Sequence, residues 1–278
     1  MHPAERRLNS PVATTTFRDH EPAMRTVLAL IALAFVTPYY VFAVIFAAMF
    51  GVKDKEGGIY RRAPKMWGRW MCRAAGARIV THGIERLRSD QPRVIISNHV
   101  SWFDVFTLAN VLPRCAFMAK GELRKIPFFG LSMERAGQLF VDRKNRKTAF
   151  AQYDDAAARI RAGATVAIFP EGTRGFAYPL RPFKKGPFVL AISAGVPIVP
   201  VLIHGSLEVL RKGTFRVRSN TIHVHVLDDI PTAGLTYDDR GKLAERVYET
   251  LRTAQRELYG IDSPPWSAAR EPNAVASN

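Results

Sequence analysis

The chain has 278 residues, a formal net charge of +16 at pH 7 and a pI near 10.3. This length gives room for one sizeable domain with an appendage, and a core of that size needs no disulfide bonds. Its two cysteines, Cys72 and Cys115, lie in unrelated contexts, which predicts a reducing compartment and excludes a cysteine-based zinc site. The positive charge indicates an anionic partner: nucleic acid, a phosphate-bearing small molecule or an anionic membrane surface.

The N-terminal part of the chain is predicted to be a leader followed by a membrane segment. Residues 1–23 are polar and without an apolar period, which predicts a disordered leader, and they lack the features of a secretory signal. Residues 27–50 carry no charge, and 24 helical residues span about 36 Å against a hydrocarbon thickness of about 30 Å. Because Pro38 falls at the middle of this segment, a tilted single span and a bent, half-inserted anchor both fit.

A run of cations interleaved with aromatic side chains follows the apolar segment. Trp67 and Trp70 among basic residues predict a helix in the headgroup layer, where each cation near an anionic surface contributes about 1 kcal/mol. An amphipathic helix that packs its aromatic face on the domain fits the same pattern. By the positive-inside rule, these charges predict that the domain that follows lies on the cytoplasmic face of the inner membrane. The cations are Lys53, Lys55, Arg61, Arg62, Lys65, Arg69 and Arg73.

From residue 77 onward, predicted strands and helices alternate. Strands are expected at residues 77–83, 94–97, 115–119, 138–142, 165–170, 197–203 and 221–226, and helices at 101–112, 148–163, 186–195 and 238–260. This alternation is typical of an α/β fold with a largely parallel central sheet covered by helices on both faces. Residues 261–278 are rich in proline, alanine and serine, which predicts a disordered tail.

The strand at residues 94–97 is followed by an imidazole, and a carboxylate comes five residues later. Asn98 and His99 are predicted to lie in the strand-to-helix turn, and Asp104 in the first turn of a helix that Ser101 caps. The carboxylate can then bond one ring nitrogen and leave the other free to take a proton, so that the pair acts as a general base. Ser101 and Asp104 also fit a capping box, in which Asp104 only completes the helix end.

The sequence contains a second histidine and aspartate at the same spacing. His223 lies within a strictly alternating segment, residues 221–226, which indicates a half-exposed strand, and Asp228 follows that segment. This second pair is expected to be incidental. The spacing alone is therefore weak support for a catalytic pair.

The buried strand at residues 165–170 leads into a predicted binding loop, residues 171–174. Gly172 lets the backbone approach a ligand, Thr173 offers a hydroxyl, and Arg174 presents a planar fork suited to phosphate. Glu171 is expected to hold Arg174 in position, and a surface ion pair between these two side chains is the alternative.

Two further cations follow predicted strands. Lys120 and Arg143 could therefore reach the same end of the sheet as His99 and Arg174. No spacing typical of a metal site appears, and no G-x-S-x-G motif is present, so neither a metal centre nor a serine hydrolase is predicted.

Four blocks, NHVSWFD, GQLFVDR, FPEGTR and VPIVP, occur in this order within residues 78–230. In this set the chain resembles the glycerolipid acyltransferase family, particularly the 1-acylglycerol-3-phosphate (lysophosphatidate) acyltransferases. The resemblance implies membrane-embedded N-terminal helices followed by an α/β domain. In this chain the helices correspond to residues 24–76 and the domain to residues 77–260. It also implies His99 as the base, Asp104 as its partner and Arg174 as the ligand of the acceptor phosphate, assisted by Lys120 and Arg143. Other residues expected to bind substrate are Asn98, Ser101, Glu171, Gly172 and Thr173.

The expected reaction transfers a fatty acyl group from acyl-CoA or acyl carrier protein to the sn-2 hydroxyl of 1-acylglycerol-3-phosphate, giving phosphatidate, without a cofactor. The expected partners are a lyso-phospholipid acceptor, an acyl thioester donor and an anionic membrane surface, with no nucleic acid. Two alternatives remain: the same chemistry on another lyso-lipid, such as a lyso-ornithine lipid, and a non-enzymatic basic protein that binds anionic lipid.

Overall fold

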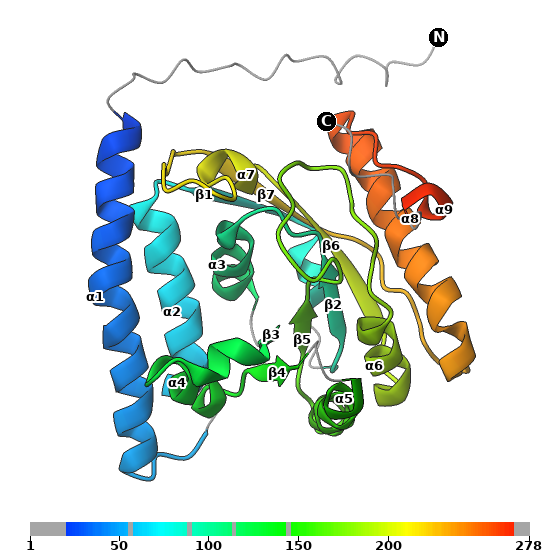
Figure 1. The fold of residues 1–278 in the computed structure, drawn as a ribbon, viewed down its shortest axis with the longest axis horizontal. Helices are drawn as coiled ribbons and strands as arrows, with labels where there is room; N and C mark the ends of the chain where they lie inside the picture. Colours follow the sequence, from blue (N-terminus) through cyan, green and yellow to red (C-terminus); the bar gives the residue numbers. More distant parts are fainter. Residues whose placement is uncertain (1–20, 55–57, 88–90, 113–114, 143–145, 270–278) are drawn as a thin grey trace.

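The computed structural model describes residues 21–54, 58–87, 91–112, 115–142 and 146–269 (Figure 1). Its first helix, α1, spans Glu21–Met49 and runs through Pro38 without a break in the helix assignment. The predicted leader therefore overlaps this helix at residues 21–23, whereas residues 1–20 lie outside the described residues. Residues 22–49 of α1 are long and apolar enough to cross a membrane, and only 17% of their most apolar window is buried in the protein. This helix is a candidate membrane segment.

The second helix, α2 (Ile59–Ala74), lies beside α1 and packs against the α/β domain (Figure 1). The Trp67 indole donates to Thr37 Oγ1 of α1 at 2.9 Å, and its ring packs edge-on against Phe106 at 4.8 Å. Trp70 is instead 46% exposed. The packing of Trp67 confirms that α2 places aromatic side chains on the domain, whereas its location in the headgroup layer stays a prediction.

Gly68 allows α2 to approach the helix α3 (Trp102–Val111) closely. A Cβ atom at Gly68 would lie 2.4 Å from the backbone oxygen of Phe106. We expect Gly68→Ala to lower the stability of the protein in detergent by about 1–3 kcal/mol, the usual cost of overpacking. Thermal unfolding measures this change. Gly241→Ala is the control, because its Cβ would meet nothing closer than 3.9 Å, so unchanged or slightly higher stability is expected there.

The core of the protein is a seven-stranded sheet in the order β1-β7-β6-β2-β5-β3-β4. Neighbouring strands are parallel except for β6 and β7, so the predicted largely parallel α/β sheet is confirmed. The strands are β1 (Arg78–His82), β2 (Val94–Ser97), β3 (Ala116–Lys120), β4 (Leu139–Val141), β5 (Val166–Ile168), β6 (Ile198–His204) and β7 (Thr221–Val226).

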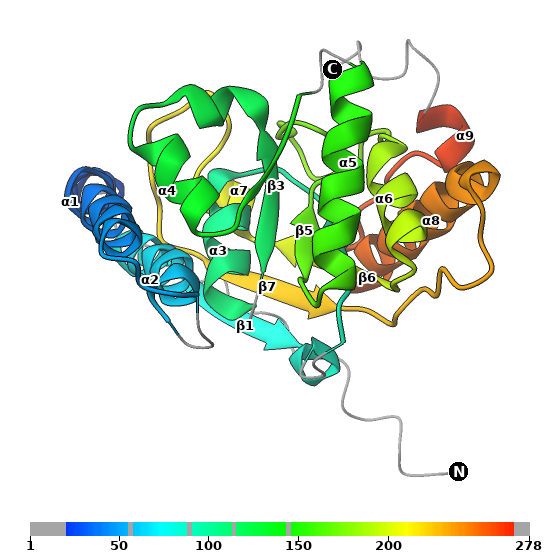
Figure 2. The same ribbon diagram turned by 90° about the horizontal axis from the view of Figure 1, so that it is seen from below.

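Helices cover both faces of this sheet, as Figure 2 shows: α1 to α4 gather on one side and α5, α6, α8 and α9 on the other. Alternate strand residues supply the two cores. Val94 and Ile96 join the core under α5, α6 and α8, whereas Ile95 between them joins the core under α1, α2 and α3. The remaining helices are α4 (Phe129–Arg135), α5 (Arg146–Arg161), α6 (Gly186–Ala194), α7 (Ser206–Val209), α8 (Arg240–Tyr259) and α9 (Trp266–Ala269).

The prediction of a disordered tail from residue 261 is wrong for residues 261–269. Trp266, in α9, is 6% exposed and packs on Tyr248 and Phe183, and the Ser263 hydroxyl donates to Gln255. The buried indole and the hydrogen bonds of Ser263 and Trp266 hold a segment whose composition is otherwise typical of disorder. Residues 270–278 lie outside the described residues. The short elements η1 (Ile84–Leu87), η2 (Gly121–Lys125) and η3 (Tyr237–Asp239), and the helices α4, α7 and α9, were not predicted.

Candidate active site

The predicted functional loops meet because they follow neighbouring parallel strands. β2 pairs with β5 on one side and with β6 on the other, and β5 pairs with β3. The carboxyl ends of these strands carry His99, Glu171 to Arg174, Ser206 and Lys120. In α/β sheets this edge is the usual place for ligands.

His99 and Asp104 contact each other directly. His99 Nδ1 lies 2.8 Å from Asp104 Oδ2, the His99 side chain is 12% exposed, and the Asp104 side chain is 0% exposed. Because Nδ1 is held by the carboxylate, Nε2 is the ring nitrogen left for a substrate. The arrangement is that of an imidazole whose tautomer is fixed by a buried acid.

Asp104 also completes a helix end, so its contact with His99 and its capping role occur together. Its Oδ2 accepts the amides of Val100 at 2.7 Å and Ser101 at 2.8 Å, within a capping box at the start of α3. Its Oδ1 accepts the hydroxyl of Ser206, which lies directly beyond β6. Four donors therefore surround one buried carboxylate and fix its position.

The second histidine and aspartate at this spacing do not pair. His223 Nδ1 lies 3.3 Å from His82 Nε2, whereas Asp228 forms an ion pair with Arg86 at 3.1 Å. The expectation that this pair is incidental is confirmed. What differs is the local structure, because His223 lies within β7 and Asp228 beyond its end, whereas the turn from β2 into α3 brings His99 and Asp104 together.

The loop at residues 171–175 holds the backbone of His99 from both sides. The His99 amide donates to Glu171 Oε1 at 2.9 Å, and the His99 carbonyl accepts from the amide of Gly175 at 2.8 Å. The imidazole itself stacks on Phe169 with ring centroids 4.0 Å apart. Gly172 adopts a φ of +79°, a conformation that glycine allows at this tight turn.

Glu171 does not hold Arg174, and it is not part of a surface pair. Its Oε2 accepts from Arg181 Nε at 2.8 Å, and the Glu171 side chain is 2% exposed. Arg181 also donates to the carbonyl of Thr173, so it links the Glu171 side chain to the backbone of the same loop. Burial raises the pKa of Glu171 to about 7, and Arg181 and the His99 amide act in the opposite direction. Both oxygens accept hydrogen bonds, so no Glu171 acceptor is directed at a ligand.

We expect Glu171→Gln to destabilise the protein and to slow the acyl transfer that the sequence predicts. A glutamine side chain has one acceptor oxygen and one NH₂ group. The NH₂ group, itself a donor, would face the N–H donor of either His99 or Arg181. An unmet buried donor costs about 1–3 kcal/mol, and displacement of His99 would lower kcat about 10- to 100-fold. Thermal unfolding and steady-state kinetics test both effects. In the control, Glu134→Gln removes an exposed pair with Arg124, for which a stability change within about 0.5 kcal/mol is expected.

Three cations line or border the same site. Arg174 stacks over the Trp102 ring at 4.9 Å, and Lys120 follows β3 at the same edge. Lys212, which sequence reasoning missed, donates to the Arg174 carbonyl at 2.9 Å. Partial burial, with Arg181, Arg174 and Lys120 nearby, lowers the pKa of Lys212, a sign of concentrated positive charge. The predicted Arg143 lies outside the described residues, so it stays a prediction.

Asn98 and Ser101 are buried supports rather than groups presented to a ligand. The Asn98 amide exchanges two hydrogen bonds with the backbone of Ile203, at 2.9 and 2.8 Å, and the residue is 0% exposed. Ser101 is equally buried, and its hydroxyl donates to the carbonyl of Leu210. The structure therefore corrects the expectation that these two side chains contact substrate. Thr173 is exposed, and both Thr173 and Gly172 line the cavity described next.

A cavity of about 380 Å³ connects these polar groups with an apolar interior. His99, Lys120 and Arg174 line its polar end. Its apolar wall is made by the N-terminal helices together with α3, α4 and β3, and includes Tyr40, Val41, Val44, Trp67, Phe117 and Met133. The cavity suits a ligand with an anionic head and an apolar tail.

Comparisons with known proteins agree with this geometry. Residues 78–204 match the family model described as Acyltransferase. The 1-acyl-sn-glycerol-3-phosphate acyltransferase of Saccharomyces cerevisiae is 30% identical over 239 residues, which cover 84% of this chain and 78% of the yeast protein. The chain belongs to the 1-acyl-sn-glycerol-3-phosphate acyltransferase family. The match to the 1-acyl-sn-glycerol-3-phosphate acyltransferase alpha of Homo sapiens is 38% identical over 185 residues, or 66% of this chain and 65% of that protein.

The fold of this acyltransferase is also similar to a solved one. The crystal structure of the 1-acyl-sn-glycerophosphate (LPA) acyltransferase PlsC from Thermotoga maritima superposes with a TM-score of 0.73 at 22% identity. The superposition covers 87% of this chain and 98% of the Thermotoga maritima chain. The family resemblance drawn from the four sequence blocks is thus confirmed, and the chain is an acyltransferase of this enzyme class.

Proposed function

We propose that this enzyme transfers a fatty acyl group from a thioester, acyl-CoA or acyl carrier protein, to the sn-2 hydroxyl of 1-acylglycerol-3-phosphate. The observation that carries the proposal is one cavity that joins His99, its buried partner Asp104, and the cations Arg174 and Lys120 to an apolar interior. Its volume, about 380 Å³, falls in the range of ligand sites, about 300–1,000 Å³.

His99 acts as the general base. An alcohol is a poor nucleophile at neutral pH, so Nε2 of His99 removes the proton of the acceptor hydroxyl as its oxygen attacks the thioester carbonyl. Asp104 stabilises the imidazolium that forms. The tetrahedral intermediate then collapses, the carbon–sulfur bond breaks, and the proton passes from His99 to the departing thiolate. The product is an ester, and no acyl-enzyme is formed.

Positioning of the acceptor completes the mechanism. Arg174 offers a planar fork and Lys120 a point charge for the phosphate, and Lys212 adds to the positive field. An acceptor held by its phosphate presents its free hydroxyl beside His99, and this orientation supplies a large part of the rate. The apolar wall takes an acyl chain.

We further propose that the enzyme works at a membrane surface, with its catalytic domain on the cytoplasmic face. Support comes from the exposed apolar surface of α1, which includes Val27, Phe35 and Phe46, and from the net charge of +16. Both features favour contact with an anionic bilayer that also holds the lipid acceptor.

The test is an assay of purified enzyme with a labelled acyl thioester and a panel of lyso-lipids. The expected result is label in phosphatidate, with 1-acylglycerol-3-phosphate used best. Preferred labelling of a phosphate-free acceptor, such as a lyso-ornithine lipid, would contradict the acceptor assignment. Salt-sensitive binding of any polyanion without turnover would contradict an enzymatic role.

A further inference from the structure

Four of the seven histidines of the chain gather on one face at one side of the sheet. In the register of β1 with β7, His82 pairs with His225, and in that of β6 with β7, His204 pairs with His223. Paired residues share a face, as do residues two apart in a strand. The apolar residues between them, Ile222 and Val224, join the core under α1, α2 and α3. The histidines therefore lie on the opposite face, away from that core.

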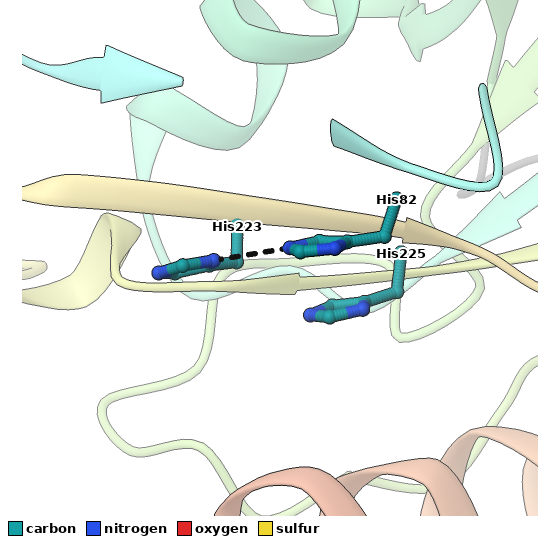
Figure 3. Close-up of side chains that lie close together, drawn as sticks. All are labelled: His82, His223 and His225. Atoms are coloured by element: carbon teal, nitrogen blue, oxygen red, sulfur yellow. Dashed lines mark hydrogen bonds between the residues drawn. The ribbon is translucent and has the colours of Figure 1, made fainter. Parts of the chain in front are cut away.

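Three of these rings bring their nitrogens close together. The ligand atoms of His82, His223 and His225 all lie within 4.8 Å of one another, and His82 Nε2 is 3.3 Å from His223 Nδ1. Figure 3 shows the three rings nearly parallel and extending to the same side of the strands. In a tetrahedral zinc site with Zn–N bonds of about 2.0–2.1 Å, two ligand nitrogens are about 3.3–3.4 Å apart. The His82–His223 separation matches this value.

The surroundings of the two β7 histidines, His223 and His225, favour the neutral form of their rings. Burial, aided by the adjacent histidines, lowers the pKa of His223 and brings that of His225 to about 4. Within the described part of the chain, the metal-ligand group contains no carboxylate. Asp228, which follows β7, is engaged with Arg86, and Glu208 accepts from Tyr178. An uncharged ring carries the lone pair that a metal needs.

Tyr259 supplies a supporting contact from a third element, at the end of α8. Its hydroxyl lies 2.6 Å from His225 Nε2. When the oxygen accepts from Nε2–H, the lone pair of His225 stays on Nδ1, the arrangement usual for a metal-bound histidine and its outer partner. His82 is exposed, and the broad torsion of its ring allows it to turn toward a shared ion.

We propose that His82, His223 and His225 bind one divalent transition-metal ion of the zinc class, with solvent in the remaining position. Imidazole sets without carboxylates favour zinc, copper and nickel over magnesium or calcium. The ion would fasten β1, the strand that follows α2, to β7. The cluster and the acyl cavity lie on opposite faces of the sheet, so the ion is a structural clamp and takes no part in acyl transfer.

The experiment uses the full chain in detergent, without a histidine tag, stripped with a chelator and then titrated with Zn²⁺. Equilibrium dialysis with elemental analysis measures the bound metal, and thermal unfolding measures its effect. We expect one equivalent of zinc and a higher unfolding temperature. His82→Gln should weaken binding by more than the 10- to 100-fold that loss of an outer partner costs, and Tyr259→Phe by about that amount.

Two comparisons keep the proposal falsifiable. His82 is exposed at an edge strand, so His82→Gln does not endanger folding. His99→Gln is the control, because it removes a histidine on the other side of the sheet and should leave zinc binding unchanged. Wild-type protein that binds no zinc, or zinc binding that survives His82→Gln and His225→Gln together, would overturn the proposal. Neither result bears on acyl transfer.

Discussion

His99→Ala is expected to abolish most acyl transfer while the protein stays folded. Loss of a positioned general base lowers kcat by about 10²- to 10⁴-fold. The fold should tolerate the change, because Asp104 keeps its bonds to the amides of Val100 and Ser101 and to the Ser206 hydroxyl. One lost hydrogen bond costs about 1 kcal/mol, or about 2–4 °C in unfolding temperature for a chain of this size. Turnover of labelled thioester and thermal unfolding measure the two quantities.

The second histidine–aspartate pair provides a matched control for this experiment. Asp104→Asn should also reduce kcat strongly, because the amide disturbs the tautomer of His99, whereas Asp228→Asn only removes a partner of Arg86. Full activity in His99→Ala would refute the assignment of the base. Equal losses in the Asp104 and Asp228 variants would show that the effect is not specific to the site.

Arg174→Ala is expected to weaken the use of a phosphate-bearing acceptor far more than it affects the fold. A hydrogen bond to a charged group contributes about 1.5–3 kcal/mol, which is about a 10- to 150-fold loss of kcat/KM. In the proposed mechanism the guanidinium binds the phosphate and not the reacting atoms, so most of the loss should appear in KM. Kinetics with 1-acylglycerol-3-phosphate at varied concentration separate KM from kcat.

The control for this change is another arginine and another acceptor. Arg124→Ala removes a cation that is paired with Glu134 at an exposed position, so it should leave KM unchanged. A phosphate-free acceptor should be a poor substrate of the wild type and insensitive to Arg174→Ala. If Arg174→Ala leaves KM for the phosphate acceptor unchanged, the cation does not bind the phosphate.

The contact between His99 and Asp104 could be predicted from sequence because its geometry is local. His99 and Asp104 are five residues apart across a strand-to-helix turn, and Ser101 marks where that helix begins. The strand order could not be predicted, and with it the pairing of β2 with β5 that brings the loops after these two strands together. Alternating apolar residues likewise predicted the strand β7 and its two faces.

The supports of the site are not local, and sequence reasoning missed them. Ser206 reaches Asp104 across 102 positions, and Lys212 reaches Arg174 across 38. The predicted partner of Glu171 was Arg174, but the structure pairs Glu171 with Arg181. The loop turns at Gly172, so Arg174 lies over Trp102 instead. The histidine cluster was missed for the same reason, since His82 is 141 residues from His223 and strand pairing alone brings them together.

The N-terminal helices α1 and α2 also form part of the cavity wall. Four residues of α1 (Thr37, Tyr40, Val41 and Val44) and three of α2 (Ala63, Pro64 and Trp67) close one side of it. A truncated form beginning at residue 77 would therefore lose one wall of the cavity together with the candidate membrane segment. The candidate membrane segment and one wall of the cavity are thus parts of the same pair of helices, so a substitution that shifts α1 or α2 also changes the shape of the cavity.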